Sequence, residues 1–445
     1  MDINRKTAYD TLLEIERTEA YSNIELNRQI SQSKPDSPGF VRELVYGVLE
    51  NKILMDFYLD RLIPSGIAKV KKQDLVLLRM GIYQIGYMDS VPEYAAVNET
   101  VNMAKKLCRG RDKFINGVLR GYIANKDSIR LPNPAKNPID YLRLKYSFET
   151  WIAKLWYERF GLEEAERLMQ ACNETPGLTV RVNTLKTDAA SLRQKLLEEE
   201  ILCEETHCCG SSISLGTPGD EVARALARTL EVKGSRVLET REYAQGLFAV
   251  QDEGSVIIVE TLEPQPGETI IDMCAAPGGK TLAMAEMMEN RGRIYAFDVY
   301  EHKLEIVRKE AARLGISIVE TDNKDGEVLQ EDILELADRV LCDVPCTGLG
   351  VIRRKPEIKY KEVLGNGDEL AEKQLRILSN GAKYVKFGGF LLYSTCTINI
   401  IENEEVIKDF INENRDFEII EQRQLLPHID GTDGFFLCKM KRVKG

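Results

Sequence analysis

The chain has 445 residues, of which 43% are hydrophobic and 29% charged. This composition is typical of a soluble globular protein, and the length predicts about two to four domains. No apolar run is long enough to span a membrane and the first residues lack the apolar core of a signal peptide, so we expect a cytoplasmic protein. The ten cysteines are then expected to be reduced thiols rather than disulfides.

The net charge of −11 at first disfavours a nucleic-acid partner, because polyanions need a positive surface. The charge is unevenly distributed, however: residues 1–135 carry 20 basic and 17 acidic residues, and the excess of acid lies in the rest of the chain. The strongest basic cluster comprises Lys105, Lys106, Arg109, Arg111, Lys113, Arg120, Lys126 and Arg130. It indicates either a surface that binds the RNA or DNA backbone or the solvated side of a few helices.

Apolar residues recur at helical spacing through the N-terminal part, with polar, glycine or proline breaks between the segments. This pattern predicts an all-α domain of five to seven short helices over residues 1–132. After a proline-rich linker, a small α+β module is expected over residues 139–238. Its possible metal ligands, Cys203, His207, Cys208 and Cys209, are not followed by a second ligand pair at zinc spacing, so no metal is expected.

From residue 239 to residue 445, apolar strands alternate with helices. Strands are expected at 269–274, 293–298, 317–320, 339–343 and 390–394, and helices at 281–288, 301–314, 368–386 and 402–413. Repeated β-α units predict a Rossmann-like, doubly wound parallel sheet, whose ligands bind at the carboxyl ends of the strands.

The first of these strands leads into a glycine-rich loop that opens a helix. The loop consists of Cys274, Ala275, Ala276, Pro277, Gly278, Gly279 and Lys280. It matches a phosphate-binding P-loop except that Cys274 stands where the first glycine should be, and Pro277 removes one N–H donor. A nucleoside cofactor that lies across the strand tips is the alternative.

Acidic residues at successive strand ends favour that alternative. Asp298 follows Gly279 by 19 residues, the place of a carboxylate that binds ribose hydroxyls, and Asp343 ends the fourth strand. Near the third strand, Asp325 is expected at the adenine end, with Asp322 as a rival. These acids would repel a triphosphate but suit S-adenosylmethionine, which carries a sulfonium cation, so this cofactor is predicted.

Two cysteines, Cys346 and Cys396, come directly after parallel strands, in Asp343-Val344-Pro345-Cys346 and Ser394-Thr395-Cys396. A lone cysteine at such a position usually packs in the core, but two at equivalent positions beside an acid favour a catalytic role. Carbon 5 of cytosine becomes nucleophilic enough to accept a methyl group once a thiolate has added to carbon 6. Asp343 would bind the Watson–Crick edge of the base during that addition.

The motifs D-M-C-A-A-P-G-G-K-T, D-V-P-C-T-G-L-G and Y-S-T-C-T resemble those of RNA cytosine-5 methyltransferases of the NOL1/NOP2/Sun family. The resemblance implies that Cys396 is the nucleophile, that Cys346 assists product release, and that S-adenosylmethionine is bound by residues 274–280, Asp298, Asp325 and Asp343. Residues 1–130 are similar to the RNA-binding antitermination factor NusB, notably at residues 42–47 and 116–120. The resemblance to family members that carry such a domain implies that the partner is small-subunit ribosomal RNA.

Three alternatives remain at this point: the same chemistry on transfer RNA, a non-catalytic RNA-binding assembly factor with a vestigial fold, and a P-loop nucleotidase. Lys280 is interpreted as either structural or substrate-orienting. A basic stretch after the Asp343 loop is expected either to hold RNA phosphates or to be a solvated loop. Its members are Arg353, Arg354, Lys355, Lys359 and Lys361.

Overall fold

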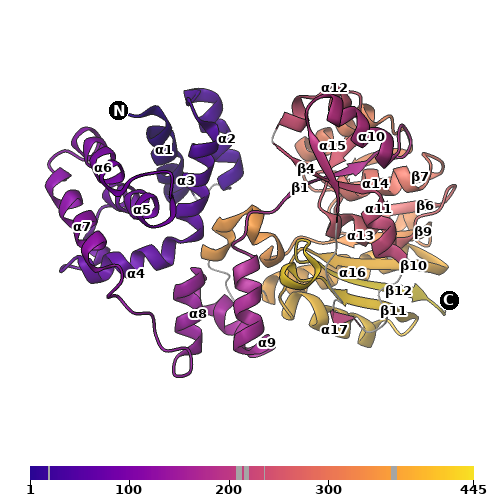
Figure 1. The fold of residues 1–445 in the computed structure, drawn as a ribbon. Helices are drawn as coiled ribbons and strands as arrows, with labels where there is room; N and C mark the ends of the chain where they lie inside the picture. Colours follow the sequence, from indigo (N-terminus) through magenta and orange to yellow (C-terminus); the bar gives the residue numbers. More distant parts are fainter. Residues whose placement is uncertain (19–20, 207–212, 215–219, 235, 362–367, 445) are drawn as a thin grey trace. The chain divides into compact units, whose positions relative to one another are not determined.

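The computed structural model describes the chain except for residues 19–20, 207–212, 215–219, 235, 362–367 and 445. It forms two compact units (Figure 1). Unit 1 comprises Met1–Glu174 together with Ile352–Lys361, and unit 2 comprises Thr175–Val351 and Glu362–Gly445. Within the described part of the chain, none of the helices is long and apolar enough to cross a membrane.

Unit 1 is helical, which confirms the all-α prediction for the N-terminal domain. Its helices are α1 (Ile3–Thr18), α2 (Ser22–Ser33), α3 (Pro38–Glu50), α4 (Lys52–Leu62), α5 (Lys72–Tyr87), α6 (Glu93–Leu107), α7 (Asp112–Asn125), α8 (Pro138–Tyr146) and α9 (Thr150–Ala171). Helices α8 and α9 belong to this unit, whereas the sequence pattern assigned residues from 139 onward to the middle module.

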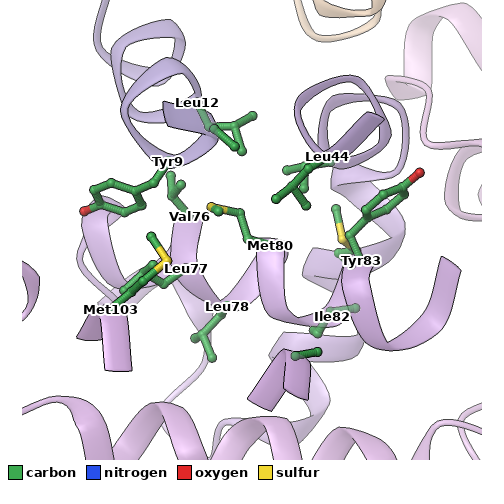
Figure 2. Close-up of a cluster of buried hydrophobic side chains, with 14 of the residues drawn as sticks. Tyr9, Leu12, Leu44, Val76, Leu77, Leu78, Met80, Ile82, Tyr83 and Met103 are labelled. Carbon is green, nitrogen blue, oxygen red and sulfur yellow. The ribbon is translucent and has the colours of Figure 1, made fainter. Parts of the chain in front are cut away.

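Helix α5 lies at the centre of the unit 1 core. Its apolar residues cover the whole circumference of the helix rather than one stripe, so burial on every side is favoured. Val76, Leu77, Leu78 and Ile82 are at most 1% exposed. Figure 2 shows Val76 and Leu77 among labelled residues of neighbouring helices, which include Leu12 of α1 and Met103 of α6.

The segment Ile352–Lys361 packs in unit 1, although the chain on both sides of it belongs to unit 2. Glu357 accepts hydrogen bonds from the Ser22 N–H (3.1 Å) and the Ser22 hydroxyl (2.6 Å). Lys359 is fully buried, and its ammonium donates to the carbonyl oxygens of Glu50 (2.8 Å) and Tyr146 (2.7 Å) and to Asn173 Oδ1 (2.8 Å). The expectation that Lys359 binds RNA phosphates is therefore wrong.

Unit 2 begins with a four-stranded antiparallel sheet in the order β2-β4-β1-β5. Its strands are β1 (Leu178–Val182), β2 (Leu202–Glu205), β4 (Thr229–Lys233) and β5 (Phe248–Val250), and its helices include α10 (Ala189–Glu198), α11 (Asp220–Ala227) and α12 (Arg241–Ala244). This confirms the α+β prediction for the middle of the chain. Cys203 is buried in β2, while His207, Cys208 and Cys209 lie outside the described residues.

The second sheet of unit 2 has the order β3-β11-β12-β10-β9-β6-β7-β8. Its parallel part consists of β6 (Thr269–Asp272), β7 (Arg293–Asp298), β8 (Val319–Asn323), β9 (Ala337–Asp343) and β10 (Val385–Thr395). Helices α13 (Glu253–Leu262), α14 (Gly279–Met287), α15 (Glu301–Leu314), α16 (Asp368–Tyr384) and α17 (Val406–Glu413) accompany it. This is the predicted Rossmann-like α/β fold.

The sheet is mixed rather than wholly parallel. Antiparallel strands β11 (Phe417–Gln424) and β12 (Phe436–Arg442) extend it beyond β10, and the short β3 (Ile213–Ser214) pairs with β11. Strands β11 and β12 were not predicted from the sequence. The charged residues of β11, at Glu418, Glu421 and Arg423, obscured its alternating pattern.

Candidate active site

The loop after β6 turns at a glycine into the next helix. Gly278 has a positive φ of 107°, a conformation that favours glycine, and a Cβ there would lie 3.2 Å from Val307 Cγ2, which is a tight contact. Helix α14 begins at the next residue, Gly279. Its N-terminus presents unpaired N–H groups on the side of the loop.

Arg181 of β1 holds the end of this loop in place, a role that no sequence pattern indicated. Its guanidinium binds both carboxylate oxygens of Glu286 in α14 (2.9 and 2.8 Å) and donates to the Gly279 carbonyl (2.9 Å). Arg181 and Glu286 are each 2% exposed at the side chain. Removing one partner would leave a buried charge unpaired.

A cleft with a volume of about 250 Å³ opens at the carboxyl ends of the parallel strands. Five predicted site residues line it: Cys274, Ala276, Asp298, Asp325 and Asp343. The lining, as far as the described residues go, does not include Ala275, Pro277, Gly278, Gly279 or Lys280. The sequence analysis did not single out the other lining residues, which are Met273, Val299, Tyr300, Lys303, Lys324, Gly326, Val344, Pro345, Lys373 and Ile377.

The acids of the cleft are fixed by short turns. Asp298 Oδ1 accepts a hydrogen bond from the Tyr300 N–H (2.9 Å), and Asp325 Oδ1 accepts one from the Glu327 N–H (2.9 Å). The rival Asp322 is exposed and pairs with Lys324 at 3.3 Å, and the cleft lining contains Asp325 and not Asp322. Of the two, Asp325 is therefore the residue that lines the cleft.

Asp343 forms an ion pair with Lys280, whose Nζ lies 2.8 Å from Asp343 Oδ2. Its other oxygen accepts a hydrogen bond from the Ser394 hydroxyl (2.8 Å). Burial disfavours the Lys280 ammonium, but the charge and the hydrogen bond of Asp343, with smaller contributions from Cys396 and Asp272, together raise the Lys280 pKa. Lys280 is thus a fixed positive charge next to Asp343 and within electrostatic reach of Cys396.

The two predicted catalytic thiols lie together. Strands β9 and β10 are adjacent and parallel, with Asp343 opposite Ser394, so the residues that follow them meet at one edge. The Sγ atoms of Cys346 and Cys396 are 3.3 Å apart, and both side chains are partly exposed. The hydrogen bond with Cys396, together with burial, holds the pKa of the Cys346 thiol well above its usual value.

Comparison with known proteins assigns the chain to a family. It is 36% identical to the probable ribosomal RNA small subunit methyltransferase B of Bacillus subtilis, with 98% of each chain covered. The chain belongs to the ribosomal RNA small subunit methyltransferase B family. A second relative of the same name, from Synechocystis, is 32% identical over 99% of each chain.

Family models match three parts of the chain. The 16S rRNA methyltransferase RsmB/F model matches residues 259–441, the NusB family model residues 2–124, and a ferredoxin-like domain model of RsmF/B-like methyltransferases residues 148–221. The crystal structure of PH0851 is similar along the whole chain, with a TM-score of 0.80, 25% identity, and coverage of 99% of this chain and 98% of that one. The resemblance stated from the motifs is thereby confirmed.

The residues that line the cleft fit S-adenosylmethionine, the cofactor that the family implies. Asp298 and Asp325 offer carboxylates for hydroxyl and amino groups, and Val299, Pro345 and Ile377 offer apolar surface for a base. Among the described residues no cluster of His, Cys, Asp or Glu is suited to hold a metal ion.

Proposed function

We propose that the chain transfers a methyl group from S-adenosylmethionine to carbon 5 of a cytidine in small-subunit ribosomal RNA, through a covalent bond between Cys396 and carbon 6. The observation that carries this proposal is the pair of thiols, 3.3 Å apart, at the ends of adjacent parallel strands. The cleft lined by Asp298, Asp325 and Asp343 lies at the same edge of the sheet.

In this proposal the residues of the cleft hold the cofactor. When bound, S-adenosylmethionine supplies an electrophilic methyl group on a sulfonium centre. Asp298 is assigned to the ribose hydroxyls and Asp325 to the adenine end, with Cys274 and Ala276 of the glycine-rich loop beside them. Pro277, Gly278 and Gly279 shape the loop without lining the cleft.

The environments of the two thiols differ in a way that supports Cys396 as the nucleophile. The raised pKa of Cys346 keeps its thiol protonated, so that it can donate a hydrogen bond to a Cys396 thiolate. The Lys280 ammonium favours negative charge on Cys396 as well. Cys346 is then the group that acts after methylation.

The chemical steps follow from this assignment. The Cys396 thiolate would add to carbon 6 and form a sulfur–carbon bond, so that the electron pair of the carbon 5–carbon 6 double bond becomes available at carbon 5. Carbon 5 would take the methyl group while the bond between methyl and sulfonium sulfur breaks, which leaves a neutral thioether. A base then removes the carbon 5 proton, the double bond re-forms and the Cys396 thiolate leaves, a step that Cys346 assists. Asp343 faces the same edge, where it would bind the Watson–Crick edge of the cytosine.

The RNA substrate is supported by unit 1 and by the names of the relatives. Six of the eight basic residues between 101 and 130 are exposed, while Arg111 and Lys126 form ion pairs with Asp74 and Glu93. Exposed cations on neighbouring helices suit the RNA backbone. We assign RNA binding to residues 1–132, a linking role to 139–238 and catalysis to 239–445.

The test is transfer of a tritiated methyl group from S-adenosylmethionine to protein-free small-subunit ribosomal RNA and, in parallel, to bulk transfer RNA. Products are digested to nucleosides. We expect 5-methylcytidine from ribosomal RNA, no product from Cys396→Ala, and a covalent protein–RNA adduct that accumulates with Cys346→Ala.

Equilibrium dialysis with S-adenosylmethionine is the control, because neither thiol is needed to hold the cofactor, and both variants should bind it like the wild type. Normal methylation by Cys396→Ala would overturn the nucleophile assignment. Label in transfer RNA alone would keep the chemistry and change the substrate.

A further inference from the structure

Glu402 lies beside the two thiols, in a short π-helix (Ile401–Glu405) that follows β10. The side chain is fully buried. Its carboxylate accepts hydrogen bonds from the Thr347 N–H (2.8 Å), the Thr347 hydroxyl (2.5 Å), Asn399 Nδ2 (2.9 Å) and Gln374 Nε2 (3.0 Å). π-helical turns are frequent at functional sites, where they aim a side chain that a regular helix would not.

Four donors occupy the lone pairs of this carboxylate. A carboxylate has about four acceptor positions, and a group that is saturated and shielded from solvent has no free position with which to take a proton from a substrate. Glu402 is therefore unsuited to the role of general base. Its contacts instead join the loop that carries Cys346 to the loop that carries Cys396.

The residues on both sides of Cys346 are held by this arrangement. Thr347 is bound by Glu402, and the Pro345 carbonyl accepts a hydrogen bond from Gln374 Nε2 (2.9 Å), which also binds Glu402. The Thr347 hydroxyl uses its proton in the hydrogen bond to Glu402, so it accepts a hydrogen bond from the Thr397 hydroxyl (2.8 Å). Thr397 is the residue directly after Cys396. A residue next to each of the two cysteines in the sequence therefore belongs to the same hydrogen-bond network.

Glu402 is itself held from β10. The Tyr393 hydroxyl donates to the Glu402 carbonyl (2.6 Å), and the Thr395 hydroxyl donates to the side chain of the next residue, Asn403 (2.7 Å). Buried polar networks that are fully satisfied rigidify the site that contains them. A catalytic pair placed on two separate loops needs such a connection to keep its geometry.

We propose that Glu402 is a positioning residue: it binds the Cys346 loop to the Cys396 loop and thereby holds the two thiols at the separation that methyl transfer and product release require. The inference deepens the proposed function and rests on it. It concerns the same reaction, and the role assigned to Glu402, whose side chain is fully buried, needs no contact with the RNA or the cofactor.

The charge of Glu402 has a second effect in the same direction. It adds to the hydrogen bond with Cys396 and to burial in raising the pKa of Cys346. Removing this charge while keeping the shape of the side chain should make the Cys346 thiolate easier to form.

The experiment compares the full-length wild type with Glu402→Gln. A glutamine has one acceptor oxygen where the network needs a carboxylate, so two of the four donors lose their partner. We expect kcat for methylation of the ribosomal RNA to fall at least about tenfold while KM for RNA stays the same, and the covalent adduct to accumulate as with Cys346→Ala. Glu405→Gln, an exposed change in the same π-helix, is the matched control and should behave like the wild type.

A second measurement needs neither RNA nor turnover. In a Cys396→Ala background, iodoacetamide alkylation of Cys346 is followed by peptide mass spectrometry over a range of pH, and Glu402→Gln should shift its midpoint to lower pH. Unchanged alkylation, or a fall in kcat without adduct, would overturn the proposal and leave Glu402 as an ordinary structural residue.

Thr347→Val distinguishes loss of the network from a simple folding defect of Glu402→Gln, because it removes one hydrogen-bond partner of Glu402 and leaves Glu402 itself unchanged. If Glu402 acts through Thr347, the double variant should be no slower than the slower single variant. Additive losses would contradict the proposal. A wild type that forms no 5-methylcytidine would refute the proposed function, while the alkylation result would still decide the role of Glu402.

Discussion

Asp272 shows how burial changes the behaviour of one carboxyl group. It ends β6, is 1% exposed, and accepts hydrogen bonds from the Thr281 hydroxyl (2.7 Å) and the Cys274 N–H (3.4 Å). Burial raises its pKa to about 7; the Thr281 hydrogen bond opposes this and the Asp343 charge adds to it. The folded protein therefore keeps a proton on Asp272 at pH values where the unfolded chain has lost it.

The sign of the pH dependence follows from that shift. The folded pKa lies above the unfolded value of 3.8, so the contribution of Asp272 to stability is fully present below that value and is lost as the pH rises through about 7. Asp272→Asn mimics the protonated form, and we expect it to stabilise unit 2 above about pH 7 by an amount on the order of 4 kcal/mol. Hydrogen exchange of the β6 amides at about pH 5 and pH 8, corrected for intrinsic rates, measures the effect.

Asp322→Asn is the control for this prediction, since Asp322 is exposed and forms only a surface ion pair with Lys324. Equal protection of β6 in the wild type and Asp272→Asn at the higher pH would show that the buried carboxyl group imposes no cost.

At the residue scale, the sequence predicted the groups whose position depends on strand ends alone. The carboxyl ends of parallel strands share one edge, so Asp298, Asp343, Cys346 and Cys396 could be placed together without coordinates. Arg181 and Glu402 could not be predicted. Their partners lie up to 105 and 55 positions away in the chain, and a single charged residue in a strand or helix carries no pattern of its own.

Among the elements, the segment Ile352–Lys361 has a sequence whose pattern was misleading. Basic residues in a proline-containing stretch predicted a solvated or phosphate-binding loop. In the structure, Lys359 is enclosed by three acceptors, and its ammonium lies 4.4 Å from the centroid of the Phe148 ring. The sequence alone does not distinguish a buried lysine whose hydrogen-bond donors are satisfied from a lysine on the surface. The acceptors lie at helix ends that are far away in the chain.

Lys359→Met tests how much this segment contributes to unit 1. Methionine fits the space of the lysine stem but leaves three buried acceptors without a donor, so we expect unit 1 to lose about 2–4 kcal/mol of stability. Urea unfolding followed by tryptophan fluorescence measures it. Both tryptophans of the chain, Trp151 and Trp156, lie in unit 1, and Trp156 packs against Phe148 with ring centroids 5.3 Å apart.

Lys361→Met provides the comparison, since Lys361 is only partly buried and lies over the Tyr21 ring at 4.3 Å. It should cost less than about 1 kcal/mol. Similar losses in the two variants would mean that the three acceptors of Lys359 do not matter for stability.

For the whole molecule, charge asymmetry predicts how the protein meets RNA. The chain as a whole is acidic, but Lys105, Lys106 and Arg109 are exposed at and just beyond the end of α6. Replacing all three with glutamine should weaken binding to small-subunit ribosomal RNA whatever its sequence. The slope of the logarithm of the binding constant against the logarithm of salt concentration should fall by the amount expected for about two to three lost phosphate contacts. Filter binding at several salt concentrations measures both quantities.

The triple change of Lys69, Lys71 and Lys72 to glutamine alters the net charge by the same amount on another exposed part of unit 1. It should leave the salt dependence nearly unchanged. Equal losses in the two triple variants would indicate that RNA responds to total charge and not to the surface at α6 and α7.

The placement of Ile352–Lys361 in unit 1 also has a consequence for biosynthesis. A chain emerges from the ribosome beginning with its N-terminus, and domains generally fold in that order. Here Lys359, which donates to Glu50, Tyr146 and Asn173, is translated only after most of unit 2. The N-terminal unit therefore reaches its final structure late in synthesis, when the glycine-rich loop and Cys346 have already been made.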